Sequence, residues 1–225
     1  MMRLALLVLV TALAPSCSLL REPPNPDLRR NAAISPIAQG LFGVQRIDDR
    51  RFDLDPSVGS VPTEDDILPF FGGVYGEPIT GDEDTQFGFE VGFTFTYDGS
   101  DERIDLAGGG SVPADVELVL FDLFGGFYVN HYVGRLRLYA GAGPLLQFGR
   151  VELVFEDPPG SLEFVDDHGF GYGYYARGGV ELEVRPGLYV GPGVRFIDSF
   201  ADLGGDLDDF EYEALQLTIG ITTGF

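Results

Sequence analysis

Segments in which apolar residues alternate with small or polar ones recur along most of the chain. The clearest covers residues 87–97, where every odd position is apolar and every even position is Gly, Glu or Thr. Successive side chains of a strand point to opposite faces, so this pattern predicts a β-strand with one apolar face and one small or polar face. Its length matches the roughly 9–11 residues that a tilted strand needs to cross a bilayer.

Four other segments repeat this alternation, at residues 135–143, 172–185, 188–196 and 215–225. Residues 116–129 are apolar on both faces, and 41–47 and 67–75 are weaker, with Pro69 indicating an edge or a strand end. Bacterial barrels of this type close on themselves and have an even number of strands. We therefore predict an all-β fold, an up-and-down antiparallel transmembrane β-barrel of eight strands.

The expected connections alternate between short and long. Residues 130–131 and 185–187 form tight turns and 78–84 a moderate one, whereas 99–114, 149–169 and 198–209 are long. Short turns at one end and long loops at the other are typical of outer-membrane barrels, whose long loops face outward from the cell. The long set contains much of the acidic charge, at Asp101, Glu102, Asp105, Glu156, Asp157, Asp166, Asp167, Asp202, Asp206, Asp208 and Asp209.

The N-terminus reads as an export signal at residues 1–16. Arg3 precedes an unbroken apolar run at residues 4–14, which is too short to span a bilayer but fits a signal peptide. Small residues before Cys17 resemble the processing site of bacterial lipoproteins, although Ala14 stands where Leu is preferred and Pro15 where a small residue is preferred. Two outcomes of processing are compatible with this sequence: lipidation of Cys17, or ordinary cleavage that leaves Cys17 as a terminal thiol.

A proline-rich stretch separates this signal from the first alternating segment. Three prolines between Pro23 and Pro26 cannot join a helix interior or a sheet ladder. We interpret residues 17–39 as an extended periplasmic tether and residues 40–225 as the barrel.

Composition narrows the range of partners. The formal net charge is −22, so nucleic acid is not an expected partner, because phosphate affinity comes from clustered Lys and Arg. The single cysteine excludes an intrachain disulfide, and the common Cys and His metal motifs are missing. We expect no cofactor and no metal centre, and at most weak binding of divalent cations at the acidic loops, for example around Asp202, Asp206, Asp208 and Asp209.

The chain resembles the small bacterial outer-membrane barrels, the group that contains the OmpA transmembrane domain, OmpX and OmpW. The resemblance covers residue 40 onward and lies in the aromatic-terminated segment 215–225, the LYAGAGP segment 138–144 and the GGVELEVRPGL segment 178–188. It implies an outer-membrane location, with membrane lipid and the barrel-insertion machinery as partners. The assembly signal would be the last strand, with Phe225, Thr223, Ile221, Ile219 and Leu217.

Two features depart from this family. Lipidation is unusual in such barrels, and Trp, which is common in their aromatic girdles, is absent. Tyrosine and phenylalanine can occupy the interface instead, and the candidates are Tyr97, Tyr172, Tyr174, Phe196 and Phe225.

The polar face of the strands predicts a charge network in the barrel interior. It consists of four acidic and four basic residues: Glu90, Asp122, Glu181, Glu183, Arg135, Arg137, Arg177 and Arg195. Buried charges need partners, and an eight-stranded barrel is just wide enough to be filled by its own side chains. We therefore expect a plugged interior. The alternative is a soluble sandwich with these residues on its outer face.

The function expected from these observations is non-enzymatic: a contribution to envelope structure or to surface interactions through acidic extracellular loops. One alternative is an OmpW-like carrier of small hydrophobic molecules, with Leu118, Leu120 and Phe124 lining a cavity. Another is a soluble, lipocalin-like periplasmic lipoprotein.

An enzyme of the lipid-hydrolysing kind would need a serine and a histidine near the rim. The chain has only His131 and His168, with Ser161 seven residues before the second, and no HxS pairing. We expect both histidines to be ordinary connection residues and no residue to be catalytic.

Overall fold

The structure, a computed structural model, describes residues 35–48, 51–53, 59–62, 67–82, 84–106, 111–157, 161–202 and 210–224. They form ten strands: β1 (Ile37–Asp48), β2 (Arg51–Asp53), β3 (Gly59–Pro62), β4 (Ile67–Gly81), β5 (Thr85–Leu106), β6 (Ser111–Val133), β7 (Leu136–Asp157), β8 (Ser161–Arg185), β9 (Leu188–Asp202) and β10 (Phe210–Gly224). No helix in the described part of the chain is long and apolar enough to cross a membrane.

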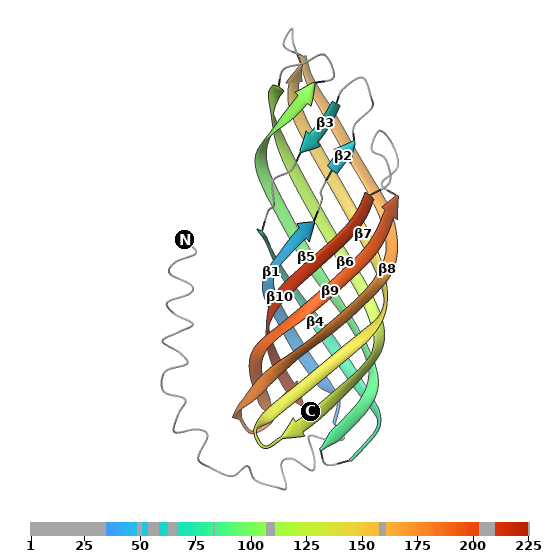
Figure 1. Cartoon of the computed structure of the whole chain (residues 1–225), viewed down its shortest axis with the longest axis vertical. Coiled ribbons are helices and arrows are strands. Elements are labelled where there is room, and N and C mark those ends of the chain that lie inside the picture. Colours follow the sequence, from blue (N-terminus) through green and yellow to red (C-terminus); the bar gives the residue numbers. More distant parts are fainter. Residues whose placement is uncertain are drawn as a thin grey trace.

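Eight of these strands close into the expected barrel. They follow the order β4-β1-β10-β9-β8-β7-β6-β5, and β5 pairs in turn with β4. Every neighbouring pair is antiparallel, and the strands are visibly tilted around the axis (Figure 1). The prediction of an all-β, eight-stranded, closed antiparallel barrel is confirmed, and the sandwich alternative is excluded.

The short hairpin of β2 and β3 lies above the barrel. It joins the upper end of β5, where Gly59 pairs with Leu106 and Ser60 with Asp105. In Figure 1 the hairpin sits beside the raised ends of β5 to β8. The sequence pattern did not predict this hairpin, because its strands are too short to show a periodicity.

One tight turn lies elsewhere than predicted. Asn130 and His131 belong to β6, and the chain reverses at Gly134 and Arg135 instead. The reversal needs a residue with positive φ, and Gly134 supplies it at 63°. The turn at residues 186–187 lies inside the predicted range, with Gly187 at φ 73°.

Two of the three long connections, 99–114 and 149–169, are mostly strand. β5 continues to Leu106, β7 to Asp157 and β8 starts at Ser161, so the ladders extend far into the segments predicted as loops. The prediction was wrong because it required an apolar face. Backbone pairing needs no such face where both sides of a sheet meet water.

The first two barrel strands are longer than their patterns indicated. Residues 41–47 extend to β1 and 67–75 to β4, which has an irregularity between Pro78 and Thr80. The expected signal peptide at 1–16, Cys17, nearly all of the tether and Phe225 lie outside the described residues.

Candidate functional site: a polar interior within an apolar wall

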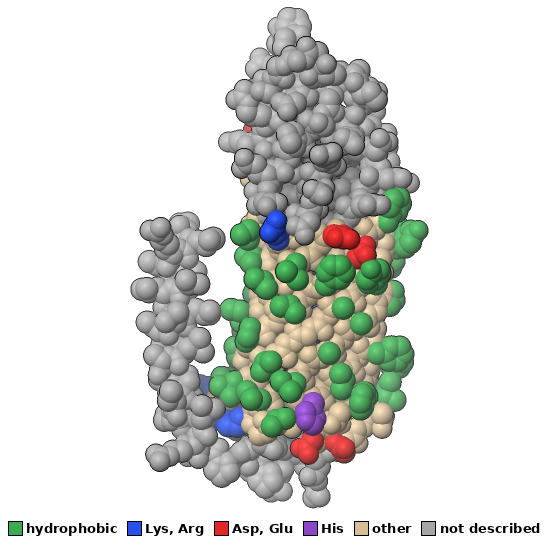
Figure 2. All heavy atoms as spheres, in the orientation of Figure 1, with side chains coloured by type: hydrophobic (Ala, Val, Ile, Leu, Met, Phe, Trp, Pro, Cys, Tyr) green, Lys and Arg blue, Asp and Glu red, His purple; other side chains and the backbone are tan. Residues whose placement is uncertain are grey.

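The barrel wall separates two kinds of side chain. Along each strand the buried, inward positions include Gln, Glu, Asp, Arg and Thr, whereas the outward positions are Phe, Val, Leu, Ile and Tyr. Figure 2 shows hydrophobic side chains spread over the visible wall, with the charged ones near its two ends. This polarity is the reverse of a soluble barrel, which buries its apolar face.

The apolar outer surface has the height of a membrane. On β5 it runs from Phe87 to Tyr97, both half exposed. Ten steps of about 3.3 Å cover ~33 Å along the strand. At a tilt of about 40° this corresponds to ~25 Å, the height of the apolar band of outer-membrane barrels.

A first polar cluster fills the lower interior. Arg137 Nη1 lies 2.5 Å from Glu181 Oε2, and both side chains are completely buried. Asn130 Oδ1 accepts from Arg137 Nε at 3.1 Å and from Nη2 at 2.8 Å. Thr222 Oγ1 accepts from Arg137 Nη1 at 3.0 Å and donates to Glu181 Oε1 at 2.9 Å. The ion pair is therefore held from β6, β7, β8 and β10.

A second cluster adjoins the first through Gln39. Arg177 donates to both carboxylate oxygens of Glu90, from Nε at 2.9 Å and from Nη2 at 2.5 Å. Tyr175 Oη also donates to Glu90, at 2.7 Å. Gln39 accepts from Arg177 and donates to Glu181 at 2.7 Å, so its amide connects the two ion pairs.

A third cluster lies higher in the interior. Arg195 Nη1 lies 3.3 Å from Asp122 Oδ2 and 2.9 Å from Thr94 Oγ1, which itself donates to Asp122 at 2.7 Å. Gln147 donates to the other oxygen of Asp122 at 3.1 Å and accepts from Ser199 at 3.0 Å. The Arg195 guanidinium also lies over the Phe124 ring, with 4.2 Å between its Cζ and the ring centroid.

The remaining two residues of the proposed charge network lie at the lower mouth. Arg135 occupies the β6–β7 turn, and its Nη2 donates to the backbone oxygen of Glu183 at 2.6 Å. The Glu183 carboxylate accepts from the amide of Gly187 at 3.1 Å. These two side chains therefore bind backbone groups of β8 and of the β8–β9 turn, and among the described contacts they form no direct ion pair with each other.

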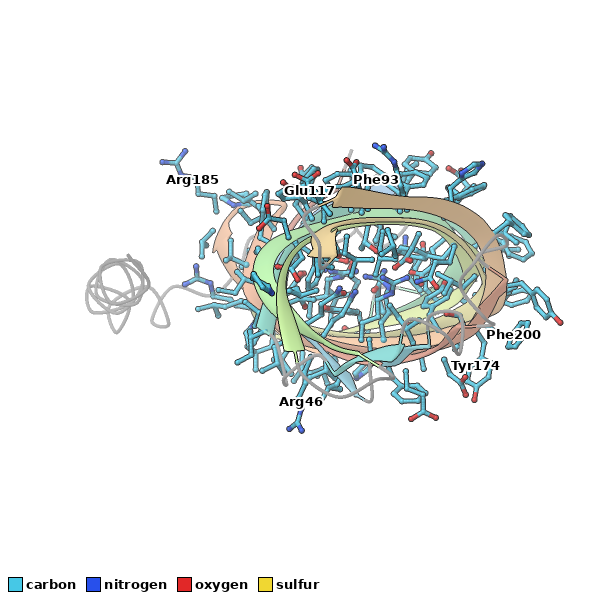
Figure 3. All side chains as sticks on the ribbon, turned by 90° about the horizontal axis from the view of Figure 1, so that it is seen from above. Arg46, Phe93, Glu117, Tyr174, Arg185 and Phe200 are labelled. Carbon is cyan, nitrogen blue, oxygen red and sulfur yellow. The ribbon has the colours of Figure 1, made fainter. Side chains whose placement is uncertain are left out.

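Apolar side chains occupy the upper interior. Leu118, Leu120 and Val151 are buried above Asp122 and Gln147, whereas Leu145 and Ile197 are buried one inward position below Gln147 and Ser199, within the third cluster. The three residues proposed for a ligand cavity, Leu118, Leu120 and Phe124, are all buried here. Phe124 contacts Tyr175, with ring centroids 4.6 Å apart. Figure 3, viewed along the axis, shows the ring of strands filled with side chains.

Glycines on the inner face provide the space for this packing. A Cβ at Gly141 would lie 2.3 Å from Glu90 Oε1, and one at Gly220 would lie 2.4 Å from Glu181 Oε1. A Cβ at Gly193 would lie 2.2 Å from the Tyr139 hydroxyl. The side chains of Glu90, Glu181 and Tyr139 thus lie against glycines, in space that any other residue at those positions would fill.

Several network members were not identified from the sequence. Gln39 links the two lower ion pairs, and Tyr139 lies between Arg137 and Arg177, whose Cζ atoms are 4.9 and 5.1 Å from its ring centroid. Inward parity could have selected Tyr139, whereas Gln39 lies in the segment predicted as tether, whose last three residues belong to β1 instead. Their partners could not be identified, because contacts across the lumen depend on the stagger of the strands.

The two histidines lie at opposite ends of the wall. In the strand register His131 pairs with Leu138 and His168 with Arg150, which are 12 residues apart on β7. This corresponds to ~40 Å along the strand, too far for a shared catalytic site. His131 Nδ1 lies 2.9 Å from Thr85 Oγ1. The described residues contain no group of three or more acidic, His or Cys side chains suited to a metal ion.

The outer face of β10 carries four of the five residues proposed as an assembly signal. Leu217, Ile219 and Ile221 point outward with Thr223, while Phe225 lies outside the described part. Four of the proposed girdle residues, Tyr97, Tyr172, Tyr174 and Phe196, are also exposed on the outer surface.

Acidic residues are concentrated in the sequence segments that hold the upper strand ends. Residues 46–67, 98–117, 150–168 and 198–213 contain 26 of the 36 acidic residues and 5 of the 14 basic ones. The described parts of these segments are upper strand ends. By sequence, nearly all of the net charge therefore falls in these strand ends and in the segments between them.

Comparisons with known proteins give similar solved structures but no matching sequence family. No family model and no curated protein matches the chain. Among solved structures, Neisserial surface protein A is similar, with 16% identity over 84% of this chain and 97% of that chain, at a TM-score of 0.40.

Two further solved structures are similar. Ail, the attachment invasion locus protein of Yersinia pestis in complex with the heparin analogue sucrose octasulfate, has 16% identity over 84% of this chain and 99% of that one, at a TM-score of 0.42. OprG from Pseudomonas aeruginosa has 12% identity over 88% and 99%, at a TM-score of 0.47. At these values the likeness concerns the barrel only, and no ligand or activity is transferred.

Proposed function

We propose that this protein is a plugged outer-membrane barrel that anchors an acidic, strand-built structure on the cell surface. The observation that carries the proposal is the reversed polarity of the wall, polar inside and apolar outside over ~25 Å. A soluble lipocalin-like lipoprotein would have no use for this arrangement, because its outer face would meet water. An apolar wall of this height is stable only in lipid or detergent.

The interior supports a structural role for the barrel. Three ion pairs, with Arg137, Arg177 and Arg195 as the cations, accept or donate further hydrogen bonds to neighbouring amides and hydroxyls. Above them, buried apolar side chains such as Leu118 and Val151 fill the cross-section. A continuous water path would have to pass both layers. We therefore assign the barrel the role of a membrane anchor, with no ion conduction.

The carrier alternative would require space among the inward apolar residues. Phe124 is in contact with both Tyr175 and Arg195, and Leu118 is 1% exposed. These contacts favour a packed core at the positions where a hydrophobic ligand would bind. The interacting part of the molecule is then its upper end, where the acidic residues lie.

The test is membrane integration combined with a conductance measurement. The full chain is expressed with its signal, and the outer-membrane fraction is washed with carbonate and run unheated and boiled on a detergent gel. The protein is expected to stay in the membrane and to migrate differently after boiling. Purified protein in a planar bilayer is expected to show no current above the leak.

Release by carbonate, or identical migration before and after boiling, would overturn the membrane anchor. Steady single-channel currents would keep the barrel in the membrane but contradict the plug. A Cys17→Ser variant serves as a control: if it becomes fully soluble, the chain is a lipid-tethered soluble protein instead.

A further inference from the structure

The outer wall has a hollow of about 530 Å³ across β1, β4 and β5. One row of the strand register explains it: Ile221 pairs with Gly40, Gly40 with Gly73, Gly73 with Phe93, and Phe93 with Leu123. All five positions belong to the outer face, and the two central ones have no side chain. The wall is therefore reduced to backbone there, between large residues on both sides.

Aromatic side chains occupy the row above the hollow, and Phe93 lines it. The next row toward the upper end contains Phe42, Phe71 and Phe95, and the Phe71 and Phe95 ring centroids are 5.3 Å apart. Phe93 projects outward from the wall beside the hollow (Figure 3). A space with these borders fits a slender apolar chain and excludes polar ligands.

The lower side of the hollow ends in a polar pair. Tyr75, which lines it, donates from Oη to Glu77 Oε2 at 2.5 Å. Glu77 is exposed on the same outer face, two residues below Tyr75, toward the end with the tight turns. An anionic group thus lies in the lowest part of the apolar wall, level with Phe89 and one outward position above Ile79, within reach of the lipid headgroups.

We infer that this hollow binds one acyl chain of a phospholipid whose primary ammonium headgroup pairs with Glu77. The inference rests on the proposed membrane location. An empty hollow would lose its dispersion contacts, and the molecules that surround a membrane wall are lipids. The carboxylate at the rim selects the headgroup, because it attracts an ammonium and repels an anionic lipid. A second copy of the chain would need a protrusion that matches the hollow.

Variants can fill the hollow without disturbing the wall. A Cβ at Gly73 would meet Phe93 Cε1 at 3.4 Å and the backbone oxygen of Gln39 at 3.7 Å, so a leucine there extends into the hollow with little rearrangement. Ala176 is exposed on the outer face of β8, on the opposite side of the barrel, and Ala176→Leu is the matched control. Glu77→Gln removes the rim charge and keeps the shape.

The experiment uses the full chain in nanodiscs with equal amounts of phosphatidylethanolamine and phosphatidylglycerol. Each protein is transferred to mild detergent, and retained lipids are counted by native mass spectrometry. Wild type and Ala176→Leu are expected to retain phosphatidylethanolamine over phosphatidylglycerol by on the order of two- to fivefold. Gly73→Leu is expected to lose the retained lipid, and Glu77→Gln to lose only the preference.

Equal retention by Gly73→Leu and Ala176→Leu, or no headgroup preference in the wild type, would overturn the inference. If the wild type is a dimer that Gly73→Leu dissociates, the inference is also overturned, because the hollow then binds a second copy of the chain. Unheated and boiled migration is compared first for every variant. If the wild type migrates identically before and after boiling, the proposed membrane anchor is rejected. If it shows the normal shift but retains lipids without selectivity, only the proposed lipid site is rejected.

Discussion

Arg137 and Glu181 form an ion pair with an Nη1–Oε2 distance of 2.5 Å, and neither side chain is exposed. The two residues lie on neighbouring strands and occupy paired positions in the register of β7 and β8. Asn130, Thr222 and Gln39 complete their hydrogen bonds. The pair is therefore a fixed part of the interior.

Removing one member of this pair should leave a buried charge without its partner. We expect Glu181→Gln and Arg137→Met each to lower the free energy of unfolding by about 3–5 kcal/mol. The double variant should lose less than the sum of the two single losses, because neither charge is then left alone. Urea unfolding in detergent micelles, followed by circular dichroism, measures all four proteins. Strict additivity would show that the two side chains act independently.

A methyl group on the inner wall should displace the second ion pair. Gly141→Ala places a Cβ against Glu90 Oε1, so the carboxylate has to move away from Arg177 and Tyr175. We expect a loss of about 1–3 kcal/mol in unfolding free energy. Gly73→Ala, whose Cβ points outward, is the matched control and should change stability by less. Equal effects at the two sites would argue against a tightly packed interior.

A charge in the middle of the outer wall should cost more than one near its upper edge. Val194 is half exposed on β9, within the apolar surface, whereas Phe200 lies beyond Asp198 on the same strand. We expect Val194→Arg to destabilise the barrel by about 2–4 kcal/mol in lipid and Phe200→Arg by about 0–1 kcal/mol. Unfolding in lipid vesicles measures both. A larger destabilisation by Phe200→Arg than by Val194→Arg would mean that the bilayer centre lies closer to Phe200 than to Val194.

The β4–β5 turn should respond to acid through Asp82. Its carboxylate accepts the amide hydrogens of Asp84 at 3.0 Å and Thr85 at 2.7 Å, and these bonds to Thr85 and Asp84 hold the pKa of Asp82 below its ordinary value. A lowered folded-state pKa stabilises the fold above the ordinary pKa of about 3.9, and this stabilisation disappears as the pH falls through the folded-state value.

Asp82→Ala should therefore lower the unfolding midpoint at pH 6, and the gap between variant and wild type should narrow below pH 4. Midpoints of urea unfolding in micelles at pH 6, 4 and 3 test this. A gap that stays constant across this range would mean that the turn does not depend on the ionised carboxylate.

The barrel was predictable from the sequence because alternation reports which face each residue occupies. The pattern of residues 87–97 needed no tertiary information, and seven of the eight residues of the proposed charge network are buried on the inner face, whereas Arg135 lies in the β6–β7 turn. Alternation could not show which inward residues meet across the lumen. Arg177 and Gln39 are 138 positions apart, and only the stagger of the closed barrel brings them together.

The turns and strand ends were harder to place for a different reason. Asn130 has turn-like chemistry, yet it is completely buried and donates to Gln86 Oε1 at 2.8 Å. A tertiary hydrogen bond thus outweighed its local preference. The hollow at Gly40 and Gly73 was invisible for the same reason as the network, because it forms only when two distant strands pair.

The seam between β1 and β10 gives the chain an obligatory order of assembly. Ile37 pairs with Gly224 and Asp48 with Glu213, so the first barrel strand finds its second neighbour only in the last one. Contacts between such distant residues form slowly, because a long loop must be closed before they form. Until then one edge of β1 and one edge of β10 are unpaired, and the apolar wall is exposed to water. Such an intermediate is prone to aggregate. This fold therefore requires a chaperone that shields the unclosed chain on its way to the bilayer.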